Sequence, residues 1–598
     1  MRAALPMDIH SYAEPDHVRV THVGLDLSVD FSQKTLSGSA RLRCSRERGD
    51  RVLVVDTQDL VVQEVVGADG KARKFTVGAA DPKLGAPLRI ELSGGEQEVL
   101  VRYHTTENAG ALQWLTPEQT SGRRFPFLFT QGQSIFTRSW IPLQDSPGVR
   151  ITFDASVRVA PTAATPDPTA LTVVMAAEQL GRGADGAFRF RFDKPIPPYL
   201  LALACGELKF APISARCGVW AEPSVVEGAA RELEDTEAMI AAAEKLYGPY
   251  RWGRYDLLVL PPAFPLGGME NPCLTFATPT ILAGDKSLVA LIAHELAHSW
   301  SGNLVTNATW RDFWLNEGFT VYLEARIMEE VFGVARAEME KQLALAELER
   351  ELSELPPADQ VLYIDLAGRH PDDGFSTVPY EKGALFLRRI EQITGRTEFD
   401  RFLRSWFSGH AFRSVHTEEF VSFLRRELLD QKPGRAEAID LDLWLHKPGL
   451  PSDAPRAASD ALQRVDRELA AWQAGKPAAQ LATAGWTTQQ WVHLIESLPA
   501  TIDPTRMAEL DQAFRFTQSG NCEIACPWLR RAVERGYSAA DARLEEFLIS
   551  VGRRKFLKPL YTELAKSESG RARARAIYQK ARSRYHPMCV TTIDKIVL

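Results

Sequence analysis

The chain has 598 residues, a formal net charge of -7, 45% apolar residues and 25% charged residues. This length exceeds what one hydrophobic core organises, so we expect about three or four domains. The ordinary composition argues against long disordered regions. The acidic balance gives no reason to expect nucleic acid or an anionic membrane surface as a partner.

Targeting and redox features indicate a cytoplasmic protein. Residues 1–30 show no basic start followed by an apolar run, and no apolar stretch has the length of about 18 residues that spans a bilayer. The seven cysteines are scattered and odd in number, which favours free thiols over a disulfide framework. Cys522 and Cys526 stand four apart, but they lack the further partners that a metal site needs.

Residues 1–205 have the pattern of an antiparallel β domain. Apolar residues alternate with polar ones on both sides of a turn at residues 32–34, which is typical of a half-buried hairpin. Gly and Pro clusters separate four further runs: Val52–Val55, Leu60–Val66, Val99–Tyr103 and Phe188–Phe192. A probable strand at Phe127–Phe129 leads to Gln133, which the residues alone allow to be a surface amide or part of a site.

The pattern becomes mixed over residues 206–446. A short buried strand, Leu257–Leu260, leads into Gly267-Gly268-Met269-Glu270. Two successive glycines let a backbone approach a substrate closely and offer N–H groups to it. A carboxylate held there pairs well with an α-ammonium group, although a single Glu after two glycines is more often a solvated turn.

His294-Glu295-Leu296-Ala297-His298 is the central motif. On a helix, residues four apart share one face, so His294 and His298 can bind one ion while Glu295 acts on a metal-bound water. Asp285 and Ser287 are expected caps of this helix and Gly302 its stop. A five-residue match of this kind also occurs by chance in long proteins.

A catalytic zinc takes three protein ligands and one water, so a third ligand is needed. Glu317 is the best candidate, because the 18 residues between it and His298 suit a helix, a short connection and a second helix from about Asp312 to Glu330, ending near Gly333. The sequence therefore predicts Zn²⁺ bound by two histidines and one glutamate.

Tyr380 lies in the segment Val378-Pro379-Tyr380-Glu381-Lys382-Gly383. A neutral phenol can donate a hydrogen bond to an oxyanion. From the residues alone, a core tyrosine is the favoured interpretation.

Residues 447–456 are rich in Pro and Gly and predict a linker. Residues 457–598 are helical by period, as a small solenoid-like domain, with amphipathic segments near Ala457–Trp472, Thr487–Leu498, Pro504–Phe516, Ile524–Arg535, Ala539–Val551 and Arg571–Arg584. The basic run Arg553-Arg554-Lys555 within this domain is, by itself, most often a solvated face.

Three motifs together carry a family resemblance: Gly267–Asn271, the HExxH motif, and Trp314–Gly318. The chain resembles the gluzincin zinc aminopeptidases. Longer segments of its sequence, including residues 378–383, are similar to the leukotriene A-4 hydrolase group with its bacterial aminopeptidases. The resemblance covers nearly the whole chain. It implies a saddle-shaped N-terminal sheet, a thermolysin-like α/β catalytic domain and a monomer with one Zn²⁺ per chain.

The resemblance also implies roles for residues. Glu295 is the general base and Tyr380 stabilises the transition state. Gly267, Gly268, Met269 and Glu270 line the substrate site, and Gln133 joins Glu270 in binding the free amine. Arg553 and Lys555 match a pair that holds a peptide's C-terminal carboxylate. The expected substrates are short peptides with a free N-terminus.

Two alternatives stay open at this point. Asp372 matches a carboxylate that directs water onto a lipid epoxide, so the second hypothesis is an epoxide hydrolase, alone or beside peptidase activity. Leu266 and Phe375, however, stand where vertebrate members carry tyrosines, and Arg554 where they carry an apolar residue. A third hypothesis, a binding protein with an inactive peptidase fold, requires the loss of a ligand or base, and none is missing.

Overall fold

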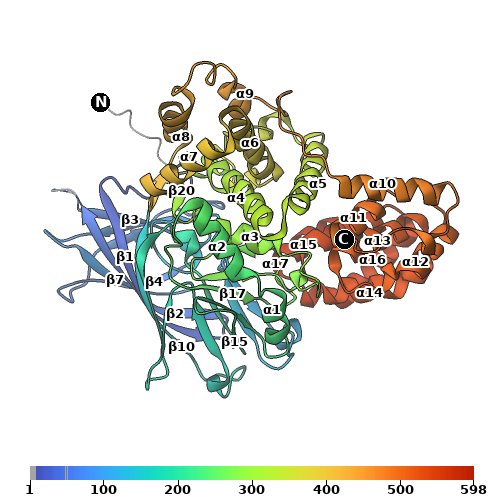
Figure 1. Ribbon diagram of the computed structural model, residues 1–598. Coiled ribbons are helices and arrows are strands. Elements are labelled where there is room, and N and C mark those ends of the chain that lie inside the picture. Colours follow the sequence, from blue (N-terminus) through green and yellow to red (C-terminus); the bar gives the residue numbers. More distant parts are fainter. Residues whose placement is uncertain (1–7, 47–48, 50) are drawn as a thin grey trace.

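A computed structural model describes residues 8–46, 49 and 51–598. The expectation for residues 1–30 falls partly outside this range. Figure 1 shows a β-rich N-terminal part, a mixed central part and a separate group of C-terminal helices, so the expected three-part architecture is confirmed. One continuous apolar core runs through the first two parts, and the C-terminal helices enclose a second core.

The N-terminal part contains three sheets. The largest has the order β12 (Glu178–Arg182), β13 (Phe188–Ile196), β10 (Ile151–Val159), β1 (Val18–Asp30), β2 (Thr35–Arg46), β7 (Glu98–His104), β4 (Val61–Gly67). A second contains β11 (Thr172–Met175), β14 (Leu203–Gly206), β9 (Phe127–Thr130) and β8 (Leu112–Leu115), and a third contains β3 (Val52–Thr57), β6 (Ala86–Glu91) and β5 (Phe75–Val77). The hairpin and the four further runs are all strands.

The largest sheet is not wholly antiparallel, which corrects the expectation in one detail. β1 and β2 pair antiparallel, but β1 and β10 pair in parallel over eight residue pairs, from His22 with Thr152 to Val29 with Val159. A parallel pair needs a long crossover connection. The chain between β1 and β10 supplies it, and period-2 alternation carries no information about strand direction.

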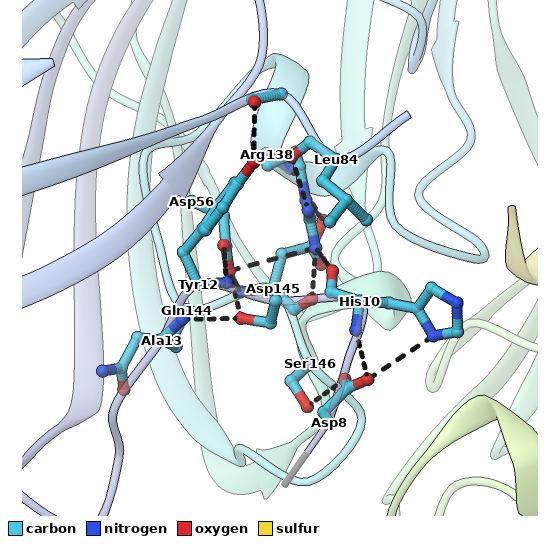
Figure 2. A network of polar contacts seen from close by, with 12 residues as sticks. Asp8, His10, Tyr12, Ala13, Asp56, Leu84, Arg138, Gln144, Asp145 and Ser146 are labelled. Atoms are coloured by element: carbon cyan, nitrogen blue, oxygen red, sulfur yellow. Dashed lines mark hydrogen bonds and ion pairs between the residues drawn. The ribbon is translucent and has the colours of Figure 1, made fainter. Parts of the chain in front are cut away.

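A buried charged network, which we call the Arg138 network, fixes the segment that carries Gln133. Arg138 is fully buried in a short 3-10 turn and donates to a carboxylate oxygen of Asp145 and to the carbonyls of His10, Leu84 and Asp145 (Figure 2). Asp56 accepts hydrogen bonds from the backbone N–H groups of Tyr12 and Asp145. The network thus holds the N-terminal segment, β3 and the turn after Gln133 together.

The central part contains a five-stranded sheet in the order β15 (Lys209–Pro212), β16 (Cys217–Ala221), β17 (Tyr255–Val259), β19 (Leu274–Ala277), β18 (Gly268–Met269), and a small pair of β20 (Val305–Asn307) and β21 (Arg413–Val415). Its helices are α1 (Val226–Glu232), α2 (Thr236–Tyr247), α3 (Ala290–Ala297), α4 (Trp314–Phe332), α5 (Val334–Leu352), α6 (Gly383–Thr394), α7 (Arg396–Gly409), α8 (Thr417–Leu424) and α9 (Leu441–His446).

The helix of the HExxH motif is shorter than expected. Asp285 does not cap it but accepts from the N–H of Ser287 in a turn ahead of the helix, and α3 begins only at Ala290. It ends at Ala297, so His298 is its C-terminal cap and Gly302, with φ of 101°, closes the following turn. The next helix, α4, agrees with the expectation and ends at Gly333.

The C-terminal helices are α10 (Asp460–Gln473), α11 (Thr488–Glu496), α12 (Pro504–Phe514), α13 (Cys522–Arg535), α14 (Asp541–Ser550), α15 (Arg554–Leu564), α16 (Glu568–Ala581) and α17 (Pro587–Val597). All six expected segments are helical, whereas α15 and α17 were not expected. Pro559 inside α15 and Pro587 at the start of α17 obscure their patterns. In the described part of the chain, no helix is long and apolar enough to cross a bilayer.

The helical domain is bonded directly to the loop that leads into the glycine pair. The N–H of Gly552 donates to the carbonyl of Pro262, and that of Arg554 donates to Pro265. A Cβ atom on Gly552 would lie 2.5 Å from the Pro262 oxygen, so only glycine permits this approach. The loop before Gly267 therefore has a fixed support from outside its own domain.

Candidate active site

A cleft of about 910 Å³ lies where the three parts of the molecule meet. Gln133 and Phe129 line it from the N-terminal part, and the C-terminal helices contribute Arg553 and Met588. From the central part come Gly267, Gly268, His294, Glu295 and Tyr380. The structure thus brings residues far apart in the sequence to one cavity.

Two histidines and one glutamate converge at one side of this cleft. The Nε2 atoms of His294 and His298 are 3.2 Å apart, and they lie 3.3 Å and 3.5 Å from Oε2 of Glu317. A tetrahedral zinc with bonds of about 2.0–2.1 Å places its ligand atoms about 3.3 Å apart. Glu317 Oε2 is buried and has no hydrogen-bond partner. The donor types, the triangle and the unpaired oxygen all fit a zinc ion.

The other ring nitrogens of the histidines are held by protein oxygens. Nδ1 of His294 lies 3.0 Å from Oε2 of Glu324, and Nδ1 of His298 lies 3.0 Å from the carbonyl of Ser301. Such contacts fix the tautomer and leave Nε2 free for a metal. Burial lowers the pKa of His298 to about 4, so this ring is neutral, as a ligand must be.

The carboxylate of Glu295 rests against the backbone of Gly268. A Cβ atom on Gly268 would lie 2.2 Å from Oε1 of Glu295, so any larger residue at this position would displace the carboxylate. Burial raises the pKa of Glu295 well above its ordinary value. Glu295 therefore has a fixed place beside the strand β18.

Tyr380 is brought to the metal site by a glycine contact. A Cβ atom on Gly318 of α4 would lie 2.7 Å from Cα of Gly383, so the two motifs that contain Glu317 and Tyr380 pack backbone to backbone. Tyr380 lies in a π-helical turn, Val378–Lys382, and its ring stacks on His294 with centroids 6.2 Å apart. Burial raises the pKa of its phenol, which stays a hydrogen-bond donor.

Glu270 and two glutamines of the N-terminal part have buried polar atoms without a hydrogen-bond partner among the described residues. These atoms are Oε1 of Glu270, Nε2 of Gln133 and Oε1 of Gln131. The Glu270 backbone is held by the Asn303 side chain, which donates to its carbonyl at 2.8 Å, and Met269 Sδ lies 3.1 Å from Nε2 of Gln131. Burial raises the pKa of Glu270 to about 7. Because unpaired buried polar groups are costly, these atoms indicate a polar ligand.

The opposite end of the cleft is cationic. Arg553 donates to Oγ1 of Thr280 at 3.1 Å and lies against Gly267, while Lys555 and Arg554 are more exposed. Asp372 also lines the cleft and accepts from Oγ of Ser134 at 2.6 Å. The residues predicted for the substrate site line the cavity, with the exception of Met269 and Glu270, and Met269 contacts Gln131 of the cavity wall.

A second group of possible metal ligands, Asp312, His416 and Glu418, has a different character. Asp312 is fully buried and accepts hydrogen bonds from Thr309, His416 and Thr417. These donors occupy its oxygens, so this group is a hydrogen-bonded cap of α8 and not a metal centre.

Family models match three successive regions. Residues 14–200 match the peptidase M1 N-terminal domain, residues 231–438 the peptidase family M1 domain, and residues 486–597 the leukotriene A4 hydrolase C-terminal domain. The chain belongs to peptidase family M1.

M1 relatives match over their full length. The chain is 35% identical to a leukotriene A-4 hydrolase from Xenopus laevis, with 98% of both chains covered, and 36% identical to leucine aminopeptidase 2 from Yarrowia lipolytica, with 97% and 92% covered. The structure of yeast LTA4 hydrolase with bestatin superposes with a TM-score of 0.92 at 32% identity, covering 100% and 98%. An M1 zinc metallopeptidase from Deinococcus radiodurans shares the fold, with a TM-score of 0.58 at 20% identity, over 74% of this chain and 97% of that one.

Several site residues were not found from the sequence. Glu324 lies two helical turns after Glu317, and that spacing is a signal that places both on one face. Gln131 and Asn303 lie close to predicted motifs. Glu523 and Met588 gave no signal, because only the packing of the helical domain against the cleft brings them there.

Proposed function

We propose that the protein is a zinc aminopeptidase that removes N-terminal residues from short peptides. One observation carries the exopeptidase assignment. A carboxylate oxygen of Glu270, a carboxylate oxygen of Glu295 and a ring nitrogen of His298 lie within 4.8 Å of one another. A substrate ammonium on Glu270 therefore has its first peptide bond beside the general base.

The reaction follows from the positions of the side chains. Zinc, when bound by His294, His298 and Glu317, lowers the pKa of its water and polarises the scissile carbonyl. Glu295 accepts the proton of the attacking water and returns it to the leaving amine.

Substrate positioning and charge stabilisation come from other groups. The Tyr380 hydroxyl donates to the oxygen that becomes negatively charged. Glu270 and Gln133 hold the free α-amine, and the Gly267-Gly268 backbone lies along the peptide. At the other end, Arg553 and Lys555 attract the C-terminal carboxylate of a short peptide, and Asp372 lines the pocket wall.

Purified protein with aminoacyl chromogenic substrates, offered with free and with acetylated amines, tests this proposal. We expect cleavage of the free-amine substrate only, and one zinc per chain. Glu295→Gln should keep the metal and lower kcat by at least about 10³-fold, because the proton acceptor is lost. Glu329→Gln on α4, a partly buried residue that pairs with Arg396 outside the cleft, is the matched control and should keep full activity.

Two results would contradict the proposal. Equal cleavage of acetylated substrates would remove the role of Glu270, and zinc without cleavage of either substrate would redirect assays to lipid epoxides. The cleft and the relatives do not favour the epoxide hydrolase alternative over the aminopeptidase.

We further propose that the enzyme is a monomer in the cytoplasm. Sedimentation measures the oligomeric state, and cell fractionation measures the location.

A further inference from the structure

The cationic end of the cleft already contains a carboxylate of the protein itself. Both carboxylate oxygens of Glu523 lie 2.7 Å from Nζ of Lys555, and one of them lies 3.7 Å from Nη1 of Arg553. Glu523 lines the same cavity as these two cations. It thus stands in contact with both residues that are proposed to receive the substrate's carboxylate.

The position of Glu523 is well defined. It lies in the first turn of α13, where its N–H donates to the capping side chain of Asn521, and α13 packs on α15, which carries Lys555. The Glu523 side chain is 17% exposed, against 55% for Lys555. The carboxylate is therefore the more buried partner and the lysine the more exposed one.

The cations at this end differ in how many of their hydrogen-bond donors are already used by the protein. Lys555 donates to two oxygens of Glu523, whereas Arg553 makes a single hydrogen bond, to Thr280, and no bidentate contact with a carboxylate among the described residues. Arg554, the third cation of the run, also lines the cavity. An arriving peptide carboxylate must therefore displace Glu523 from Lys555, share Lys555 with Glu523 through its third N–H donor, or bind the arginines alone.

We propose that Glu523 is a specificity-determining residue, an internal competitor that weakens binding of substrates with a free C-terminal carboxylate. This inference rests on the aminopeptidase function proposed above. Glu523 lowers the net positive charge of the cleft end and occupies two of the three N–H donors of Lys555. It therefore reduces the binding advantage of a short free peptide over a substrate that lacks a carboxylate there. It touches no reacting atom and has no part in the bond cleavage.

Glu523→Gln is the direct test, because glutamine keeps the shape and removes the charge. The substrates are one tripeptide as its free acid, the same tripeptide as its C-terminal amide, and an aminoacyl anilide. We expect KM for the free acid to fall by about three- to fivefold, the range of a partly exposed ion pair. KM for the amide and the anilide, and kcat for all three, should stay unchanged.

The control is Glu534→Gln, on the same helix but paired with Arg531 and outside the cavity. It should change none of the constants. If Glu523→Gln raises KM for the free acid, Glu523 positions the cations and the inference is wrong. If all three substrates change equally, or the acid-to-amide ratio stays the same, the inference is also wrong.

The failure of the proposed function gives a different pattern. In that case the unaltered protein cleaves neither the anilide nor the tripeptides. Unchanged anilide turnover by Glu523→Gln also shows that the variant is folded, so a null effect on the free acid counts against the competitor role and not against the assay.

Discussion

Two buried clusters of charged groups differ in one respect that separates structure from function. In the Arg138 network the guanidinium makes hydrogen bonds to Asp145 and to three carbonyls, and Asp56 accepts from backbone N–H groups. In the metal site, by contrast, Glu270, Gln133 and Glu317 each keep a buried atom without a partner. The side-chain atoms of Arg138, Asp56 and Asp145 show no such deficit within the described residues.

This difference shows which buried polar atoms still need a partner from outside the protein. Burying a polar atom without a hydrogen bond costs about 1–3 kcal/mol. A network with all its bonds made is complete and stabilises the fold. We infer that a cluster that leaves several buried atoms unpaired beside a cavity is completed by a metal and a substrate. Arg138 and Asp56 are fully buried, and Glu270 and Glu317 are buried as well, so burial alone does not identify the active site.

Removing a metal ligand should give the largest effect on activity. Glu317→Gln replaces the anionic oxygen of the zinc triangle, so we expect zinc content near zero and kcat/KM lower by more than about 10³-fold, because water activation and carbonyl polarisation are lost together. Metal analysis and kinetics on the purified variant are the measurements. Retained zinc with full activity would show that Glu317 is not a ligand.

Breaking the Arg138 network should lower the folding stability and leave the activity of the folded protein nearly unchanged. Arg138→Met leaves two buried carboxylates without their cation, which costs about 3–5 kcal/mol of folding free energy. Denaturant unfolding measures this loss, and activity per folded molecule should stay close to normal. Arg158→Met, at an exposed ion pair with Asp26, is the control and should lose no more than about 1 kcal/mol.

A change beside a metal ligand should have a smaller effect on zinc binding than a change of the ligand itself. Glu324→Gln weakens the contact to Nδ1 of His294 but keeps all three ligands, so zinc affinity should fall by about 10- to 100-fold. Competition with a chelator measures it, and added zinc should restore the turnover. Glu330→Gln, on the same helix and paired with Lys245 outside the cavity, should leave the affinity unchanged.

Local patterns predicted much of this molecule. Period-2 alternation located β1 and β2, and amphipathic segments located six C-terminal helices. Spacing on a helix identified His294 and His298 as a pair, and the distance to Glu317 predicted the second helix. The family resemblance supplied the roles of Tyr380, Gln133 and the carboxylate-binding pair Arg553 and Lys555. The residues alone favoured a core tyrosine and a solvated face, and they left Gln133 open between a surface amide and a site residue.

The remainder depends on contacts between distant segments. No local pattern shows that β10 runs parallel to β1, or that Arg138 lies between His10 and Leu84. The start of α3 at Ala290 was missed because Asp285 and Ser287 have the composition of a helix start but form a turn instead. Glu523 could not be predicted, because its role arises only where α13 and α15 meet the cleft.

The contact between Gly552 and Pro262 has a consequence for how this protein can be engineered. Since the helical domain supplies a hydrogen bond to the very loop that precedes Gly267, the three domains are not interchangeable modules. A chimaera that takes its helices from a relative must preserve this glycine and the length of the loop around it. Otherwise the graft would misalign the peptide-binding backbone even though every zinc ligand remained in place.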